Sequence, residues 1–249
     1  MQLSDMLQLV VSVTGVTHYL PMSEPTTDNV LKAAINLYFD LRTPETTPAP
    51  LLIALHGYGA NKRQMMRESQ LMTPASFAIA SLQGFHQHMR EAKEEGGPLR
   101  FGFGWLTNFR PEESIAIHHQ ALSDLIQRLV GERVADPERI FLLGFSQSCA
   151  PNYRFAFTHP DYLRGVIGIC GGVPSDWHTN EIYKPTRAEV LHLAGSRDEF
   201  YTPERISNYE QQLGKRAASV EFKSYDAAHE IVQDMRIDVM KWLSDRATK

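Results

Sequence analysis

Residues 139–148 read RIFLLGFSQS, an apolar run followed by a serine with a glycine two residues before it. The run RIFLL is typical of a buried strand. GFSQS nearly matches G-x-S-x-G, the pattern of a sharp turn from a strand into a helix that exposes a reactive serine. Ser148 stands where the second glycine is expected. Ser146 is therefore either an activated nucleophile or an ordinary polar residue at the end of a buried strand.

Four other short apolar runs accompany this one: LLIAL (51–55), FAIAS (77–81), GVIGIC (165–170) and EVLHLAG (189–195). Continuous rather than alternating apolar runs are typical of strands that are covered on both faces, as in a parallel sheet. Helical patterns lie between and after them, at residues 115–129, 202–214 and 231–242. Strands and helices in alternation predict an α/β fold with a doubly wound, mainly parallel sheet.

The N-terminal part follows a different pattern. Residues 8–20 and 31–42 look like two strands, and the second is followed by the Pro/Thr-rich turn TPETTPAP. An antiparallel N-terminal edge on the sheet accounts for this order. A chain of 249 residues fits one domain. We therefore expect a single domain over residues 1–249, in which residues 1–49 supply the edge strands and the turn.

Residues 83–113 form the one long segment without a clear periodic pattern, with EAKEEGGP at its middle and RFGFGW after it. Loops of this length in a compact domain are usually functional or mobile. This segment leaves the C-terminal end of a predicted strand, where open α/β sheets bind their ligands. We therefore expect residues 83–113 to form a long active-site loop.

Composition excludes several kinds of partner. The chain has 25 basic and 29 acidic residues and no basic block, so we expect no nucleic-acid partner. The first residues lack a basic n-region, and no apolar run reaches the roughly 18 to 20 residues that span a bilayer. Cys149 and Cys170 lie in apolar contexts, which predicts buried free thiols rather than a disulfide framework. A cytoplasmic location is the expectation.

A serine hydroxyl needs a histidine to take its proton and a carboxylate to hold that histidine. After Ser146, the chain offers Asp198 in LAGSRDEF and His229 in YDAAHEI, in the order Ser, Asp, His that follows such a turn. Both residues come after predicted strands, whose carboxyl ends share one edge of the sheet. We predict that these three residues form a catalytic triad. Glu199 and Asp226 are the alternative carboxylates.

The chemistry also needs two backbone N–H groups that stabilise the oxyanion of the tetrahedral intermediate. One is expected from Gln147, directly after the nucleophile. The second is expected from the loop LHGYGAN (55–61), which follows an early strand. Gly57 and Gly59 allow that backbone to turn sharply and to approach a ligand closely. We therefore predict the N–H of Tyr58 as the second donor.

The set L-H-G-x-G, G-F-S-Q, G-x-x-D and a final H-E-I resembles the phospholipase/carboxylesterase family of α/β-hydrolases. This family includes acyl-protein thioesterases and lysophospholipase-like carboxylesterases. The resemblance covers roughly residues 50–245. It implies the α/β-hydrolase fold, the catalytic roles of Ser146, Asp198 and His229, and oxyanion donation by the two backbone amides named above. Trp105 resembles a tryptophan that the family places near the acyl site, which implies a substrate-binding role.

The chain departs from the family pattern at two places. The usual GFSQGG reads GFSQSC, and the segment 84–104 is long and charged. Ser148 is tolerated at the turn if the next helix lies slightly further away, or if its hydroxyl bonds a nearby backbone carbonyl. The long segment means that the preference for an acyl chain or leaving group does not carry over from the family.

The other histidines predict no metal site. His56 in LHGYG is expected to be structural, with a proton shuttle as the alternative. His86 and His88, with His118 and His119, show no established zinc spacing. We expect neither a metal nor another cofactor.

Together, these residues predict a serine hydrolase that cleaves small carboxylic esters or thioesters through an acyl-enzyme intermediate. The first alternative is a peptidase or a polyester depolymerase of the same fold. The second is a catalytically silent hydrolase-fold binding module, which the altered GFSQS turn motivates. A homodimer is possible, although no patch of the sequence identifies its interface.

Overall fold

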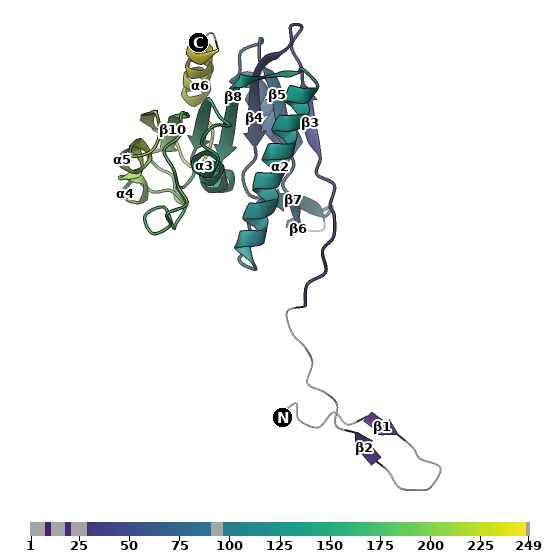
Figure 1. Ribbon diagram of the computed structural model, residues 1–249. Helices are drawn as coiled ribbons and strands as arrows, with labels where there is room; N and C mark the ends of the chain where they lie inside the picture. The colour runs from purple at the N-terminus through teal and green to yellow at the C-terminus, as the bar shows by residue number, and fades with distance from the viewer. Residues whose placement is uncertain (1–7, 11–17, 21–28, 91–96, 248–249) are drawn as a thin grey trace. The chain divides into compact units, whose positions relative to one another are not determined.

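The structure is a computed structural model, and it describes residues 8–10, 18–20, 29–90 and 97–247. The chain divides into two compact units, Met1–Asn36 and Leu37–Lys249. The second unit contains the central sheet and the helices that cover it (Figure 1). A single domain over residues 1–249 stays a prediction.

The first unit contains two short strands, β1 (Gln8–Val10) and β2 (His18–Leu20), which pair antiparallel with each other. The sequence predicts one strand over residues 8–20, whereas these strands form a two-stranded sheet of their own. The predicted strand also includes residues 11–17, which lie outside the described part of the chain.

The central sheet has seven strands in the order β11-β10-β9-β8-β4-β5-β3. Their bounds are β3 (Phe39–Arg42), β4 (Ala49–Leu55), β5 (Ala78–Leu82), β8 (Ala135–Phe145), β9 (Gly165–Ile169), β10 (Glu189–Gly195) and β11 (Ser219–Tyr225). All neighbouring pairs are parallel except β3 with β5, which is antiparallel. The predicted mainly parallel sheet with an antiparallel edge is confirmed. The edge strand is shorter than the predicted 31–42, because residues 29–36 are exposed and belong to the other unit.

The helices follow the predicted alternation with the strands. Their bounds are α1 (Lys62–Leu71), α2 (Pro111–Gly131), α3 (Cys149–Thr158), α4 (Pro203–Ile206), α5 (Tyr209–Gly214) and α6 (Gln233–Arg246), with the 3₁₀ turn η2 (Ser146–Ser148) before α3. The single helix predicted over residues 202–214 is divided into α4 and α5. Within the described ranges, we find no helix whose length and apolar character would let it cross a membrane.

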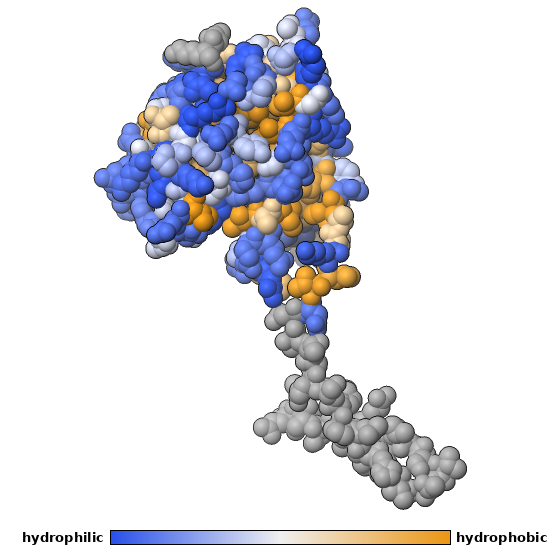
Figure 2. Space-filling model, in the orientation of Figure 1, coloured by the Kyte–Doolittle hydropathy of each residue, from blue (hydrophilic) through white to orange (hydrophobic). Residues whose placement is uncertain are grey.

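The sheet is covered on both faces, which explains the continuous apolar run in β4. Leu51, Ile53 and Leu55 pack into one core with residues of α2 and α3. Leu52 and Ala54 point to the opposite face and pack into a second core with residues of α1 and α6. The side chains alternate between faces, but both faces are apolar, so the sequence shows no alternation. Hydrophilic side chains cover most of the face that Figure 2 shows.

Part of the segment 83–113 is regular. The strands β6 (His86–Arg90) and β7 (Arg100–Gly104) pair antiparallel, so the predicted irregular loop is wrong for these residues. The physical reason is an alternating pattern in β6, where the side chains of His86 and His88 are half-buried and the residue between them is exposed. Residues 91–96, at the middle of the segment, lie outside the described part. The role of the segment at the active site stays a prediction.

Replacement of a core phenylalanine tests the two-faced core. Phe141 in β8 is fully buried between the rings of Phe77 and Trp242, at centroid distances of 5.7 and 5.9 Å. Phe141→Ala is expected to lower the free energy of unfolding by about 3 to 5 kcal/mol, because it removes buried contacts and leaves a cavity. Urea unfolding followed by circular dichroism measures this change.

The matched control is Phe109→Ala, since Phe109 is 76% exposed. This variant is expected to stay within about 0.5 kcal/mol of the wild type. Equal unfolding midpoints for the two variants would contradict the placement of Phe141 in the core.

Candidate active site

The nucleophile candidate lies in a tight turn at the end of the central strand β8. Ser146 has a φ of 57°, in the left-handed region that non-glycine residues rarely adopt. A Cβ at Gly144 would come within 2.7 Å of Nδ2 of Asn152 and 3.1 Å of the backbone N of Cys149. The glycine is therefore required before the serine. Such local strain clusters at functional sites, where the surrounding structure holds it in place.

Ser148 fits this turn through hydrogen bonds. Its side chain is fully buried, and Oγ accepts a hydrogen bond from the backbone N–H of Phe145 at 3.0 Å. The hydroxyl also lies 2.9 Å from the carbonyl oxygen of Leu55 and 3.0 Å from that of Phe145, to either of which it can donate. Ser148, which stands where the family has a glycine, therefore links the turn to the end of β4.

The structure brings the three predicted triad residues together. Oγ of Ser146 lies 2.8 Å from Nε2 of His229. Nδ1 of the same imidazole lies 2.8 Å from Oδ2 of Asp198. Asp198 follows β10 and His229 follows β11, so both side chains leave the same edge of the parallel sheet as Ser146.

Asp198 lies in an environment that favours its charged form. Burial of the carboxyl group raises its pKa. Hydrogen bonds from the backbone N–H of Tyr201, from His229 and from the backbone N–H of Phe200 lower the pKa, and they outweigh burial, so the pKa lies below its ordinary value. The two backbone bonds reach Oδ1 at 2.8 and 2.9 Å, which leaves Oδ2 for the imidazole. A carboxylate can therefore hold the Nδ1–H tautomer of His229.

The two alternative carboxylates lie elsewhere. Asp226 accepts a hydrogen bond from Nε of Arg197 at 2.6 Å, and its side chain is 86% exposed. Glu199 is also exposed. The carboxylate at hydrogen-bond distance from His229 is that of Asp198.

The loop after β4 is held in a conformation that requires its glycines. A Cβ at Gly57 would come within 2.8 Å of the ring of Phe145, and Gly59 has a φ of 77°. The antiparallel pair of β6 and β7, called the hairpin below, holds this loop in place. The N–H of Gly59 donates to the carbonyl of Phe103 at 2.8 Å, and Nη1 of Arg90 donates to the carbonyl of Gly59 at 2.9 Å. The intervening Tyr58 is one of the two predicted oxyanion donors.

His56 has a structural role in this loop. Nδ1 donates to the carbonyl of Gly57 at 2.8 Å, and Nε2 accepts from the N–H of Gly84 at 2.9 Å. Burial lowers the pKa of His56 to about 4, while the hydrogen bond to the Gly57 carbonyl acts in the opposite direction. Each ring nitrogen therefore forms a hydrogen bond with a backbone group. With this lowered pKa, the imidazole is neutral near pH 7.

Trp105 is fully buried. Its indole Nε1 donates to the carbonyl of His56 at 2.7 Å, and its backbone N–H donates to Oε1 of Gln147 at 2.8 Å. Its neighbours Gly104 and Leu106 line a pocket beside the turn. The hydrogen bonds of Trp105 to His56 and Gln147 connect it to both loops that carry the predicted oxyanion donors. Substrate contact by Trp105 stays a prediction.

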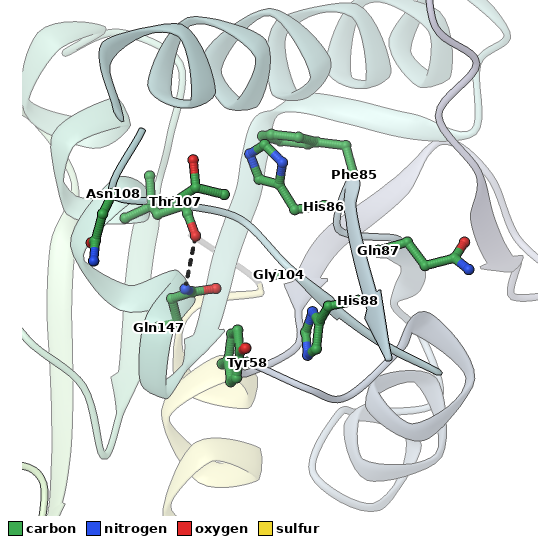
Figure 3. A pocket seen from close by; sticks show the side chains of 10 residues that line it. Tyr58, Phe85, His86, Gln87, His88, Gly104, Thr107, Asn108 and Gln147 are labelled. Atoms are coloured by element: carbon green, nitrogen blue, oxygen red, sulfur yellow. Dashed lines mark hydrogen bonds between the residues drawn. The ribbon is translucent and has the colours of Figure 1, made fainter. Parts of the chain in front are cut away.

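The pocket beside the turn has a volume of about 640 Å³ (Figure 3). Tyr58 and Gln147 both line it, so the two predicted oxyanion donors lie at the same hollow. His86 and His88 enter from β6, and Asn108 lies across from them. This His-Gln-His stretch shows no established zinc spacing. Its alternation, typical of a strand, was the signal that both imidazoles share a face.

Several residues in the described part of the chain bear on metal and thiol chemistry. The ranges that the structure describes contain no group of three or more His, Cys, Asp or Glu residues that could hold a metal ion. Cys149 and Cys170 are free and buried. Burial raises the pKa of the Cys149 thiol above its ordinary value and that of Cys170 to about 12. Both sulfurs are therefore neutral thiols, unsuited to act as nucleophiles.

The sequence model of the phospholipase/carboxylesterase family matches residues 37–246. The chain belongs to this family. It has the α/β-hydrolase fold of that family. The resemblance noted over residues 50–245 is thereby confirmed and extends to the edge strand β3.

The individual relatives are distant in sequence from this family member. The protein NocK of Nocardia uniformis subsp. tsuyamanensis is 27% identical over 152 residues, which cover 60% of this chain and 40% of NocK. The Bacillus cereus carboxylesterase structure is 16% identical with a TM-score of 0.67, covering 84% of this chain and 94% of that one. A Mesorhizobium loti carboxylesterase is 19% identical with a TM-score of 0.62, covering 78% and 88%. At these identities, the structural likeness shows the shared fold.

The hydrogen bonds of Ser148 can be tested through stability. Ser148→Ala removes a hydroxyl from a fully buried site and leaves the N–H of Phe145 without this acceptor, so the free energy of unfolding is expected to fall by about 1 to 3 kcal/mol. The exposed Ser175 provides the matched control, because Ser175→Ala removes the same hydroxyl from a solvated site. Chemical unfolding of both variants checks this, and an unchanged Ser148→Ala midpoint would show that the turn does not need the hydroxyl.

Proposed function

We propose that this hydrolase cleaves small carboxylic esters or thioesters through an acyl-enzyme formed on Ser146. One observation carries the proposal. A continuous chain of hydrogen bonds runs from Oγ of Ser146 to Nε2 of His229 and from Nδ1 of His229 to Asp198, each 2.8 Å long. These are the distances at which a base can accept the proton of a serine nucleophile and a carboxylate can orient that base.

In the proposed reaction, Oγ of Ser146 attacks the acyl carbon while its proton passes to Nε2 of His229. The bond between the acyl carbon and the leaving oxygen or sulfur then breaks, and Nε2 returns the proton to the leaving atom. Water attacks the acyl-enzyme with His229 again as base, which releases the acid and restores Ser146. Asp198, with its lowered pKa, stays ionised and stabilises the transient imidazolium. No cofactor takes part.

The backbone N–H groups of Tyr58 and Gln147 are the proposed oxyanion donors. Their position at one pocket supports this role. So does the anchoring of both loops, since the side chain of Gln147 bonds the backbone of Trp105 and the loop at Gly59 bonds the hairpin. Donors that are held in place before the reaction stabilise developing charge without reorganisation.

Two alternatives remain distinct from this proposal. A peptidase or polyester depolymerase would use the same triad on another bond, and comparing esters, thioesters and amides separates these activities. A catalytically silent binding module was motivated by the altered turn. The hydrogen bonds of Ser148 weaken that motive, because they let the turn keep its shape with serine in place of glycine.

Replacement of the nucleophile tests the proposal. Ser146→Ala is expected to reduce hydrolysis of p-nitrophenyl acetate by at least about 10³-fold, because no covalent intermediate can form. Initial rates are measured beside the wild type and the Ser175→Ala variant. Activity that survives in Ser146→Ala would remove Ser146 from the mechanism, and an inactive wild type on esters and thioesters alike would favour the binding module.

The choice of carboxylate has its own test. Asp198→Asn is expected to lower kcat by about 10³ to 10⁴-fold, because an amide can hold His229 in the wrong tautomer and cannot stabilise the imidazolium. Asp226→Asn serves as the control, since Asp226 pairs with Arg197 in solvent. Its kcat is expected to stay within about twofold of the wild type. The reverse pattern would assign the orienting role to Asp226.

A further inference from the structure

The pocket beside the predicted oxyanion donors is polar. Of the ten residues that line it, seven carry a hydrogen-bonding side chain: Tyr58, His86, Gln87, His88, Thr107, Asn108 and Gln147. None of the ten carries a carboxylate. A pocket that binds an alkyl chain is instead lined mainly by apolar side chains. The volume of about 640 Å³ is sufficient for a whole acyl group.

A second pocket, of about 230 Å³, has a mostly apolar surface. Gly57, Phe145 and Ile231 are among its lining residues. This smaller hollow is the alternative place for an alkyl chain. If the acyl group enters the larger pocket, the enzyme is expected to prefer polar acyl groups. If it enters the smaller pocket, the enzyme is expected to prefer alkyl chains.

The position of the polar pocket indicates which part of the substrate enters it. In the proposed reaction, the leaving atom must receive its proton from Nε2 of His229, so the leaving group lies on the side of that imidazole. The acyl group extends away from it. The described lining residues are Tyr58, residues 85–88, Gly104, residues 106–108 and Gln147, and none comes from the loops of Asp198 or His229. The pocket therefore lies on the acyl side.

Both imidazoles in the pocket are held in position. Nε2 of His86 lies 2.8 Å from Oγ of Ser114, which fixes one ring nitrogen. The ring of His88 stacks on that of Tyr58 with centroids 4.4 Å apart and planes 6° from parallel. Figure 3 shows the two imidazoles on one side of β6, with Gln87 turned away from them. Groups that are fixed before binding lose little entropy when a ligand arrives.

His88 also has an unmet hydrogen-bonding group. Within the described part of the chain, its buried Nε2 has no hydrogen-bond partner. A Cβ at Gly102, on the paired strand, would come within 2.7 Å of this atom, so a glycine at this position lets the imidazole pack directly against β7. The ring of His88 is therefore held by Tyr58 on one side and by the backbone of β7 at Nε2.

We propose that His86 and His88 are specificity residues that bind a distal oxygen of the acyl group, so that the enzyme prefers acyl groups ending in a hydroxyl over alkyl chains of equal length. This inference rests on the proposed function, because it concerns the substrate of Ser146. A site with fixed hydrogen-bonding groups discriminates against a ligand that leaves those groups unpaired.

Two esters of equal chain length test the inference: p-nitrophenyl ω-hydroxyhexanoate and p-nitrophenyl heptanoate. They differ only in a terminal hydroxyl or methyl group, far from the carbonyl, so their intrinsic reactivities match. The wild type is expected to favour the hydroxy ester in kcat/KM by about tenfold, the effect of roughly one good hydrogen bond. The double variant His86→Leu/His88→Leu is expected to abolish this ratio, mainly through KM. His178→Leu is the matched control, because His178 is exposed on another loop, and it should keep the ratio.

The outcomes separate this inference from the proposed function. A wild type that cleaves both esters equally, or prefers heptanoate, overturns the inference and leaves the role of Ser146 intact. A wild type that cleaves neither ester, like Ser146→Ala, counts against the proposed function itself. A double variant that keeps the wild-type ratio overturns the assignment to the two histidines. If the double variant does not fold, the wild-type ratio still decides whether the pocket prefers a hydroxyl.

Discussion

The sharp turn at Ser146 is the constraint on which the site depends. β8 lies in the middle of the sheet, between β4 and β9, and its end must turn into α3 within a few residues. The close approach of α3 leaves no room for a side chain at Gly144. The hydroxyl of Ser148 connects this turn to the carbonyl of Leu55, at the end of β4. Because β4, β8, β10 and β11 run parallel, the loops after them meet at one edge, where His229 reaches Ser146.

The sequence predicted the parts of the fold and site that depend on local pattern and on chain order. Continuous apolar runs identified strands buried on both faces, and the structure confirms that β4 packs against a core on each face. The order of Ser146, Asp198 and His229 after three strands was sufficient to anticipate that they would be neighbours. In a parallel sheet, the carboxyl ends of all strands lie on the same side, so chain order carries spatial information.

Other features depend on contacts between distant segments, and the sequence does not show them. β6 and β7 contain charged, histidine and glycine residues in place of an apolar run, and they are fixed by bonds to the loop at Gly59. Trp105 is fully buried and its indole donates to the carbonyl of His56, 49 residues away, a contact that the sequence does not show. The predicted edge strand is too long because the mainly apolar sequence at 30–36 is exposed in this chain.

Gln147 links two functions that enzymes often adapt separately. Its backbone N–H is a proposed oxyanion donor, while its side chain accepts from the N–H of Trp105 and donates to the carbonyl of Leu106, which lines the polar pocket (Figure 3). A change at this position would move the wall of the pocket and the reaction centre together. Substitutions in β6 can therefore change the substrate range without moving the proposed oxyanion donor, whereas a substitution of Gln147 would change both.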